Sequence, residues 1–262
     1  MRHPKEPAAR QQQSPPNVHP IIVIPARMAS TRLPGKPLAL IGGRPMILHV
    51  LDRAREAAIG PVLVACSEPE VAEAVRADGG LAVLTDPDLP SGSDRVLAAL
   101  ARVDPDGAHD LIINLQGDLP SIPPAQIVAV RDALADSDAE LATLVAPITD
   151  AAEAAAPSVV KAVCGFAPGA RFAPALYFSR AAVPWGDGPL WHHIGIYGWR
   201  RAALARFVTL PPSPLELREK LEQLRALEAG MRIVCARVDA APHGVDTQDD
   251  LARARRAMEA RT

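Results

Sequence analysis

Short runs of aliphatic residues alternate with amphipathic segments along the first half of the chain. The runs have the length and the β-branched content of strands buried on both faces, and they lie at 21–24, 62–66, 81–84 and 111–115. Between them, apolar residues recur at helical spacing at 47–58, 71–79, 94–103 and 122–134. Strands that alternate with helices predict a parallel sheet, whose ligands bind beyond the carboxyl ends of the strands.

The second half of the chain is less regular. Four apolar runs without full helices between them predict an antiparallel portion, and they lie at 141–145, 159–163, 171–178 and 194–199. Leucines at helical spacing predict one helix over 214–229, and a last strand is expected at 233–238. Thr247, with Asp250 three residues later, has the form of a capping box and predicts the start of a terminal helix.

The length and composition fit one globular α/β domain. Hydrophobic residues make up 48% and charged residues 22% of the 262 positions, so a packed core is expected over 20–262. Residues 1–19 are polar and interrupted by prolines, and we expect them to form a disordered tail. The three cysteines are widely spaced without a Cys-x-x-Cys pair, so neither a disulfide framework nor a zinc site is expected.

The charge balance and the hydropathy limit the classes of partner. A formal net charge of -2 gives no basic surplus, so no nucleic-acid partner is expected. No apolar run is long enough to span a membrane, and the basic residues near the N-terminus are not followed by the apolar segment of a signal peptide. A cytoplasmic protein without a membrane partner is therefore expected. The charge balance does not exclude small anions as ligands.

The segment after the first predicted strand concentrates positive charge. It carries three cations and two hydroxyls, which are Arg27, Arg32, Lys36, Ser30 and Thr31. Guanidinium and ammonium groups, together with backbone N–H groups, suit a polyphosphate. The segment is not a Walker A loop, because Ser30 and Pro37 replace its first glycine and its Ser/Thr. A solvated loop with incidental cations is the alternative, but the position behind a strand favours the polyphosphate.

These residues form the pattern R-x-x-S-T-R-L-P-G-K-P-L over 27–38, which closely resembles the signature of the CMP-3-deoxy-manno-octulosonate (CMP-Kdo) synthetase family. The loop alone indicates only a nucleotidyltransferase. Later blocks continue the resemblance in order and spacing over about 21–258, and they separate Kdo transfer from sialic-acid or sugar-1-phosphate chemistry. These blocks lie at 44–47, 114–118, 177–180, 195–198, 212–216, 221–225 and 244–247.

The resemblance implies a nucleotidyltransferase-type, Rossmann-like three-layer α/β fold with a mainly parallel central sheet. It also implies a homodimer that forms through a small antiparallel sub-sheet. That sub-sheet would belong to an inserted portion at about 147–211 that covers the acceptor site. Trp185, Trp191 and Phe207 are apolar candidates for the contact between subunits.

The reaction that the resemblance implies is transfer of CMP from CTP to the anomeric hydroxyl of Kdo, with release of pyrophosphate, for lipopolysaccharide biosynthesis. Arg27 and Lys36 would hold the triphosphate and, together with Asp118, form the catalytic set. Asp118 follows the fourth strand and Asp246 precedes the terminal helix, where a parallel sheet gathers its ligands. Two carboxylates suit Mg2+, which completes its shell with phosphate and water. Taken singly, Asp118 is better explained as a turn residue and Asp246 as a charge at the start of a helix, but together with the resemblance the two favour metal binding. The sequence does not tell whether one ion binds or two.

The other candidate residues bind substrate by resemblance. On the nucleotide side they are Ser30, Arg32, Ser67 and Arg95. On the acceptor side they are Gln116, Arg180, His193, Tyr197, Glu216, Glu219 and Gln223. His and Arg pair with a carboxylate, while Gln and Glu bind hydroxyls. The alternatives are a solvated Glu219–Gln223 pair one helical turn apart, a core position for Tyr197, and a surface ion pair for Arg180.

Four positions depart from the family pattern. Leu119 stands where an acidic residue often follows the Gly-Asp pair, and Ser67 stands where an aspartate is common. Asp94 stands where the longer glutamate is usual, and His192 stands where a cation usually precedes the acceptor histidine. These changes leave two further hypotheses: CMP transfer to another acidic sugar, such as an amino-Kdo or a sialic-type sugar, and a non-catalytic nucleotide-binding protein. The retained cations and paired aspartates argue against the second.

Overall fold

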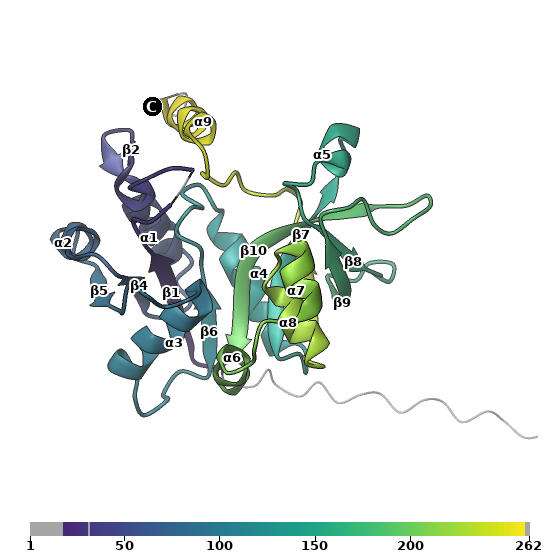
Figure 1. Ribbon diagram of the computed structural model, residues 1–262, viewed down its shortest axis with the longest axis horizontal. Helices are drawn as coiled ribbons and strands as arrows, with labels where there is room; N and C mark the ends of the chain where they lie inside the picture. The colour runs from purple at the N-terminus through teal and green to yellow at the C-terminus, as the bar shows by residue number, and fades with distance from the viewer. Residues whose placement is uncertain (1–17, 31, 260–262) are drawn as a thin grey trace, which may run out of the picture.

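A single nine-stranded sheet forms the centre of the protein in the computed structural model, which describes residues 18–30 and 32–259 (Figure 1). Its strands are β1 (Pro20–Ala26), β4 (Val62–Cys66), β5 (Leu81–Leu84), β6 (Leu111–Asn114), β7 (Leu141–Ile148), β8 (Lys161–Cys164), β9 (Phe172–Ser179), β10 (Leu190–Arg200) and β11 (Ile233–Arg237). Their order across the sheet is β5-β4-β1-β6-β10-β7-β11-β9-β8. A separate hairpin consists of β2 (Leu40–Ile41) and β3 (Arg44–Pro45).

Helices cover both faces of this sheet. They are α1 (Met46–Glu56), α2 (Pro69–Ala77), α3 (Gly92–Val103), α4 (Pro124–Ala135), α5 (Ala151–Ala155), α6 (Arg201–Val208), α7 (Pro214–Glu219), α8 (Gln223–Glu228) and α9 (Gln248–Glu259), with a 3-10 helix η1 (Lys36–Leu38). Ile22 and Ile24 of β1 pack with α1, α2 and α4, whereas Ile21 and Val23 pack with α3, α6 and α8. Because successive side chains of a strand point to opposite faces, the unbroken apolar run of β1 is buried between two helical layers.

The parallel part of the sheet follows the sequence prediction. β5, β4, β1 and β6 pair in parallel, while β10 lies antiparallel between β6 and β7. The expected antiparallel sub-sheet is not a separate sheet. β9 pairs with β11, β8 pairs with β9, and β8 also pairs with β10. The central sheet therefore folds back on itself at this end.

The helix predicted over 214–229 is two helices. Lys220 lies between α7 and α8 in the left-handed region, with φ 58° and ψ 46°. The carbonyl oxygens of Glu219 and Lys220 accept hydrogen bonds from the Arg180 guanidinium at 2.7 and 3.3 Å. These contacts with β9 satisfy carbonyl groups that a helix end leaves without internal partners. The leucine spacing continues across the break and therefore could not reveal it.

The terminal helix α9 begins as predicted. The Thr247 N–H donates to Asp250 Oδ2 at 2.9 Å, and the Asp250 N–H donates to Thr247 Oγ1 at 3.2 Å. Leu251 of α9 then packs against Ile41 of the β2–β3 hairpin. The sequence prediction missed this hairpin, α5 and α6, because elements this short carry too little periodicity.

The chain enters the fold just before β1. Val18 packs against the core, and the His19 N–H donates to Asp110 Oδ1 at 2.7 Å. The rest of the predicted tail, residues 1–17, lies outside the described residues. Within the described part of the chain, no helix is both long enough and apolar enough to cross a membrane.

A buried aspartate stabilises the turn after α3. Asp104 accepts hydrogen bonds from the N–H groups of Ala108 and His109 at 2.8 and 3.1 Å, and from Arg201 Nη1 at 2.5 Å. Burial alone would raise the pKa of Asp104, but these hydrogen bonds outweigh it and lower the pKa from 3.8 to about 2. The folded state therefore binds this proton more weakly than the unfolded state does. The resulting stability is present above about pH 4 and is lost as the pH falls towards 2.

We expect Asp104→Asn to lower the free energy of unfolding at pH 7 by about 2 kcal/mol. The same variant should lose less stability than the wild type when the pH is lowered from 5 to 3. Urea unfolding at these pH values measures both effects. Asp106→Asn, at an exposed position two residues away, is the matched control. Equal acid sensitivity of Asp104→Asn and the wild type would contradict this account.

Candidate active site

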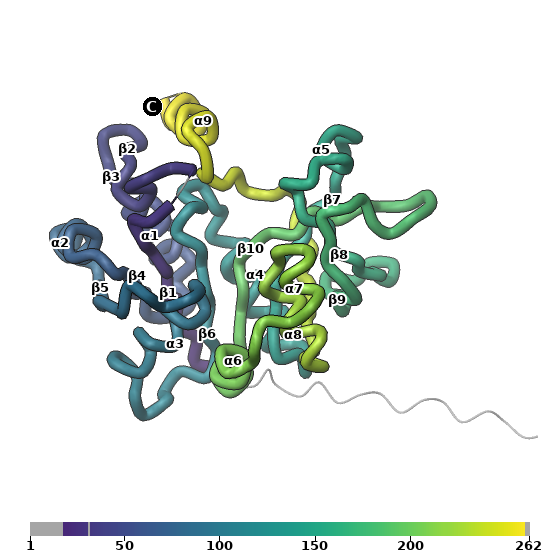
Figure 2. Tube along the Cα trace, in the orientation of Figure 1, coloured from purple at the N-terminus to yellow at the C-terminus, as the bar shows by residue number. Residues whose placement is uncertain are grey.

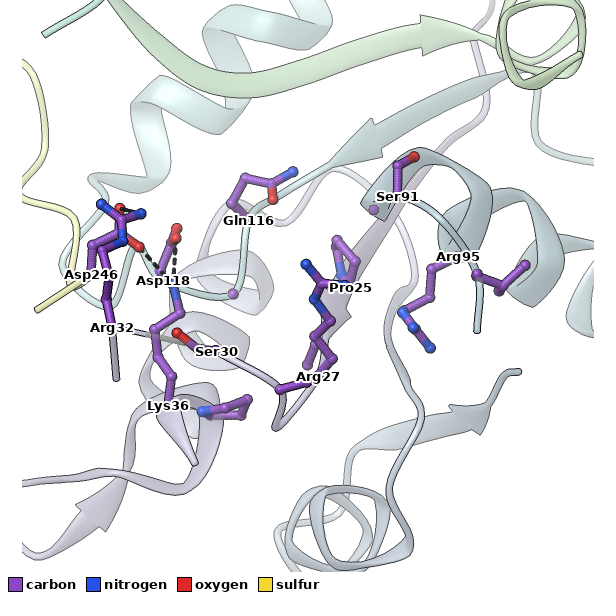
Figure 3. Close-up of a pocket in the computed structure, with 16 residues that line it drawn as sticks. Pro25, Arg27, Ser30, Arg32, Lys36, Ser91, Arg95, Gln116, Asp118 and Asp246 are labelled. Atoms are coloured by element: carbon purple, nitrogen blue, oxygen red, sulfur yellow. Dashed lines mark hydrogen bonds and ion pairs between the residues drawn. The ribbon is translucent and has the colours of Figure 1, made fainter. Parts of the chain in front are cut away.

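A pocket of about 370 Å³ lies at the carboxyl ends of β1 and β6 (Figure 3). This is the edge at which a parallel sheet binds its ligands. Eight residues predicted from the sequence line the pocket, namely Arg27, Ser30, Arg32, Lys36, Arg95, Gln116, Asp118 and Asp246. They come from the loop after β1, from α3, from the loop after β6 and from the segment before α9.

One ammonium group joins two carboxylates inside the pocket. Lys36 Nζ donates to Asp118 Oδ2 and to Asp246 Oδ1, each at 2.9 Å. Arg32 Nη2 contacts the other oxygen of Asp246 at 3.1 Å. Burial acts to lower the pKa of Lys36, but the two carboxylates outweigh it and raise that pKa. The ammonium group therefore stays charged and balances the aspartates.

The C-terminal part of the chain brings Asp246 to this pocket. After β11, residues 238–247 cross over to the side of the molecule that carries β2, where α9 docks (Figures 1 and 2). The Val245 N–H donates to the carbonyl oxygen of Asp118 at 2.9 Å, and the Val245 side chain is buried with Leu33. This backbone bond fixes the two aspartates side by side, although they lie far apart in the sequence.

The paired carboxylates fit a magnesium ion. Asp118 and Asp246 each present an oxygen to the same ammonium nitrogen, so these oxygens converge on one cation position. Among residues 18–30 and 32–259, no group of three or more His, Cys, Asp or Glu side chains is arranged to hold a metal. Two oxygen ligands suit Mg2+, because this ion keeps water and substrate phosphate in its shell.

Cationic side chains occupy the other side of the pocket. Arg27 is exposed and Arg95 is buried, and both lie across the pocket from Lys36 (Figure 3). Arg95 Nη1 donates to Thr85 Oγ1 at 2.5 Å and to the carbonyl oxygen of Asp86 at 3.2 Å. Its buried Nη2 has no hydrogen-bond partner among the residues that the structure describes. Burial, and to a smaller extent the charge of Arg27, lowers the pKa of Arg95. A ligand that accepts a hydrogen bond would satisfy the free Nη2.

The sequence analysis missed two pocket residues that shape the backbone. Ser91 caps α3, and its Oγ accepts from the N–H groups of Ser93 and Asp94 at 3.1 and 3.3 Å. The spacing of Ser91 and Asp94 is that of a capping box, which would have placed the helix start correctly. Gly117 forms part of the pocket wall, and a Cβ there would lie only 3.0 Å from the carbonyl oxygen of Pro25. The close approach of the two loops thus favours glycine at this position.

A second cluster of predicted residues lies outside this pocket lining. Tyr197 Oη donates to Gln223 Oε1 at 3.3 Å, and Gln223 Nε2 lies 3.5 Å from His193 Nδ1. Burial lowers the pKa of His193 to about 3, with a smaller effect of His192. His193 is therefore neutral at physiological pH. Binding of the sugar carboxylate by His193 stays a prediction.

The remaining acceptor candidates make contacts within the protein. Glu219 accepts from Ser179 Oγ at 2.8 Å and from the Arg180 N–H at 2.9 Å. Glu216 forms a two-pronged ion pair with Arg225, at 2.8 and 2.5 Å, and also completes the capping box of α7. The alternative of a Glu219–Gln223 pair on one helix is wrong, because the break at Lys220 puts them on different helices. Binding of the acceptor by these residues stays a prediction.

Three positions that depart from the family pattern have clear locations. Ser67 is not among the residues that line the pocket, and Leu119 is buried in the core. His192 Nδ1 lies 2.6 Å from Glu153 Oε1 of α5. The histidine thus pairs with a carboxylate of this chain instead of facing the nucleotide pocket.

Glu222 was not among the predicted residues, but it connects the start of α3, at the nucleotide pocket, with the cluster of His193, Tyr197 and Gln223. Ser93 Oγ, near the start of α3, donates to Glu222 Oε2 at 3.3 Å. The next residue, Gln223, belongs to the His193 cluster. Burial raises the pKa of Glu222, against a hydrogen bond from Ser91 that lowers it. The sequence block 221–225 contained this residue, and its acidic side chain beside Gln223 was the available signal.

Known proteins match both the sequence and this fold. Residues 21–233 match the family model described as Cytidylyltransferase. The 3-deoxy-manno-octulosonate cytidylyltransferase of Rhodospirillum centenum (strain ATCC 51521 / SW) is 63% identical over 244 residues, which cover 93% of this chain and 95% of that protein. This chain belongs to the 3-deoxy-manno-octulosonate cytidylyltransferase family. The family member from Methylobacterium radiotolerans is 61% identical, over 92% of this chain and 98% of that protein.

Solved structures place this cytidylyltransferase in the same fold. The structure described as CMP:2-keto-3-deoxy-manno-octonic acid synthetase complexed with CTP superposes with a TM-score of 0.86 at 41% identity, covering 93% of this chain and all of that chain. A cytidylyltransferase from Leptospira borgpetersenii superposes with a TM-score of 0.60 at 17% identity, which shows a shared fold alone. The cytidylyltransferase thus has a mixed α/β fold with a nucleotidyltransferase-like core.

Proposed function

We propose that this enzyme transfers CMP from CTP to the anomeric hydroxyl of Kdo, giving CMP-Kdo and pyrophosphate. Proteins that are similar to it over nearly the whole chain are named 3-deoxy-manno-octulosonate cytidylyltransferase. The observation that carries the proposal is the position of Lys36 between Asp118 and Asp246, across the pocket from the free guanidinium nitrogen of Arg95. A charged triphosphate and a cation together complement this arrangement, because it offers donors on one side and carboxylates on the other.

The nucleotide binds in the pocket between β1 and β6. Arg27, Arg32 and Lys36 hold the triphosphate, with Ser30 beside them, while Arg95 donates to the nucleotide from the pocket wall. Phosphoryl transfer requires little covalent help from side chains, so these groups act by positioning CTP and by balancing its charge. Lys36 moves from the carboxylates to the phosphates when CTP arrives.

Asp118 and Asp246 would hold Mg2+ when the nucleotide is bound. The ion would supply neutralisation of the charge that develops on the phosphate oxygens. The protein contributes two carboxylates that the Val245 backbone bond keeps together. Release of Lys36 from both carboxylates frees them for this role.

The acceptor sugar binds next to the nucleotide, where Gln116 borders both groups of residues. Gln116 lines the nucleotide pocket, and its Nε2 donates to Asn114 Oδ1 at 2.9 Å. Asn114 lies opposite Tyr197 in the β6–β10 pairing. This register supports binding of the acceptor sugar at the cluster of His193, Tyr197 and Gln223, next to the pocket.

A different acidic sugar is the second candidate acceptor. His193 is neutral and His192 pairs with Glu153, so neither histidine offers a free positive charge to a carboxylate. An amino-Kdo or a sialic-type sugar with other polar groups would meet the same cluster. Reaction class and nucleotide are unaffected by this choice.

Pyrophosphate release by the purified protein with Mg2+ tests the proposal. CTP, UTP, GTP and ATP are each combined with Kdo and with a panel of other sugar acids. We expect fast release with CTP and Kdo together, and release at least about tenfold slower with the other nucleotides. Release with CTP and another acid would identify the second candidate. No release with any pair, while CTP still binds, would leave a nucleotide-binding protein without turnover.

The proposed setting is a cytoplasmic homodimer in lipopolysaccharide biosynthesis. Trp185 and Leu176, both within 147–211, are 99% and 65% exposed, and such apolar surface favours a partner subunit. The other two sequence candidates for that contact, Trp191 and Phe207, are buried in the core of the same chain. Their role is internal packing.

A further inference from the structure

An irregularity in β10 brings two acceptor-cluster residues together. In a regular strand, the side chains of residues i and i+4 are separated by about 13 Å. The rings of His193 and Tyr197 have centroids only 5.7 Å apart. The pairing with β7 explains this: Ile194 lies opposite Leu144 and Tyr197 lies opposite the adjacent residue Thr143. Two extra residues of β10 bulge out and shorten the distance along the strand.

Thr143 occupies the centre of this bulge and is fully buried. Its hydroxyl lies 3.0 and 2.9 Å from the carbonyl oxygens of Ile194 and Ile196, which the bulge removes from the regular ladder. The same oxygen lies 2.9 Å from His193 Nε2. One short side chain therefore contacts both the irregular backbone and the histidine.

These contacts determine which nitrogen of His193 carries the proton. The hydroxyl of Thr143 has a single hydrogen, which it directs to the two carbonyl oxygens, so its oxygen accepts from His193 Nε2–H. His193 is neutral, and Nδ1 is consequently bare. Gln223 Nε2 then donates to Nδ1, which leaves Gln223 Oε1 to accept from the Tyr197 hydroxyl. The hydrogen bonds from Tyr197 through Gln223 and His193 to Thr143 therefore all donate in the same direction.

We propose that Thr143 is a positioning residue for the acceptor site, which holds the β10 bulge and sets the His193 tautomer so that the Gln223 amide and the Tyr197 hydroxyl face the acceptor in one orientation. The proposal rests on the proposed function for its effect on catalysis. Thr143 itself touches no substrate, because His193 lies between it and Gln223. It acts on the sugar hydroxyls through a relay of hydrogen bonds.

Removal of the hydroxyl should therefore affect the acceptor and not the nucleotide. Thr143→Val keeps the shape of the side chain but leaves His193 Nε2 and the two carbonyl oxygens without their partner. We expect the KM for the acceptor to rise about tenfold, the size typical of a buried hydrogen bond left unmade, with the KM for CTP unchanged. Thr143→Ser keeps the hydroxyl and should restore the acceptor KM to within about threefold of the wild type.

The side-chain 15N chemical shifts of His193 test the tautomer without any substrate. The wild type should show a protonated Nε2 and a bare Nδ1, and a His193→Asn sample assigns the signals. A protonated Nδ1 in the wild type would overturn the proposal whether or not the variants fold. An unchanged acceptor KM in folded Thr143→Val, or equal losses for CTP and acceptor in both variants, would also overturn it. A wild type inactive with every acceptor but with the expected tautomer would count against the proposed function alone.

Discussion

Replacing Asp118 by asparagine should reduce kcat by about 10³-fold while leaving CTP affinity within about threefold of the wild type. Asparagine has the same shape but no charge, so the site would keep one carboxylate for a divalent ion in place of two. The cations that hold the triphosphate, including Arg27 and Arg95, are untouched. Pyrophosphate release gives kcat, and calorimetric titration with CTP gives the dissociation constant.

Asp138→Asn is a matched control for this experiment. Asp138 is exposed, forms an ion pair with Arg232 at the surface, and is not among the residues that line the pocket. It should leave turnover unchanged. If Asp118→Asn retained wild-type kcat, then the carboxylate pair would have no part in the reaction. If it lost CTP binding in parallel with kcat, then Asp118 would serve nucleotide affinity, and the division of roles between the two sides of the pocket would be wrong.

Lys36→Met should change two properties in opposite directions. The variant removes the charge that the triphosphate needs, so kcat/KM for CTP should fall by about 10²- to 10³-fold. It also removes the ammonium group that balances Asp118 and Asp246 in the free protein. With only Arg32 left beside Asp246, the two carboxylates repel each other and attract a cation more strongly. In the absence of nucleotide, the affinity for Mg2+ or Mn2+ should therefore rise by about tenfold.

Metal titration of the free protein and steady-state kinetics together test this pair of effects. Arg256→Met removes a positive charge from an exposed position of α9 and should change neither property. A weaker metal affinity in Lys36→Met would mean that the lysine organises the carboxylates instead of competing with the ion for them. Unchanged kcat/KM for CTP would remove Lys36 from the nucleotide site.

The nucleotide half of the site could be predicted from the sequence because its residues are local to strand ends. Arg27 and Lys36 follow β1, and Gln116 and Asp118 follow β6. A parallel sheet brings such segments to one edge whatever the details of packing. Asp246 needed the family resemblance, since its path to the pocket depends on the crossing segment and the Val245 backbone bond.

The acceptor half could not be predicted in the same way. Its arrangement depends on the bulge in β10 and on the break at Lys220, and neither alters the hydrophobic pattern of the chain. Burial also sets the chemistry of His193 in a way that the sequence pattern does not show, because its apolar surroundings lower its pKa to about 3 and keep the ring neutral at physiological pH. Sequence reasoning proposed these residues as acceptor candidates but gave neither their protonation nor their partners within the protein.

The distance along the chain between Lys36 and Asp246, 210 residues, has a consequence for how the enzyme is made. The ribosome delivers the triphosphate loop long before the second carboxylate. Since N-terminal parts tend to fold first, a growing chain presents Lys36 and Asp118 before their partner exists. A polypeptide that terminates before the crossing segment keeps most of the sheet and the cationic side of the pocket, yet it lacks one of the paired carboxylates. Incomplete products of translation would thus bind nucleotide without consuming it.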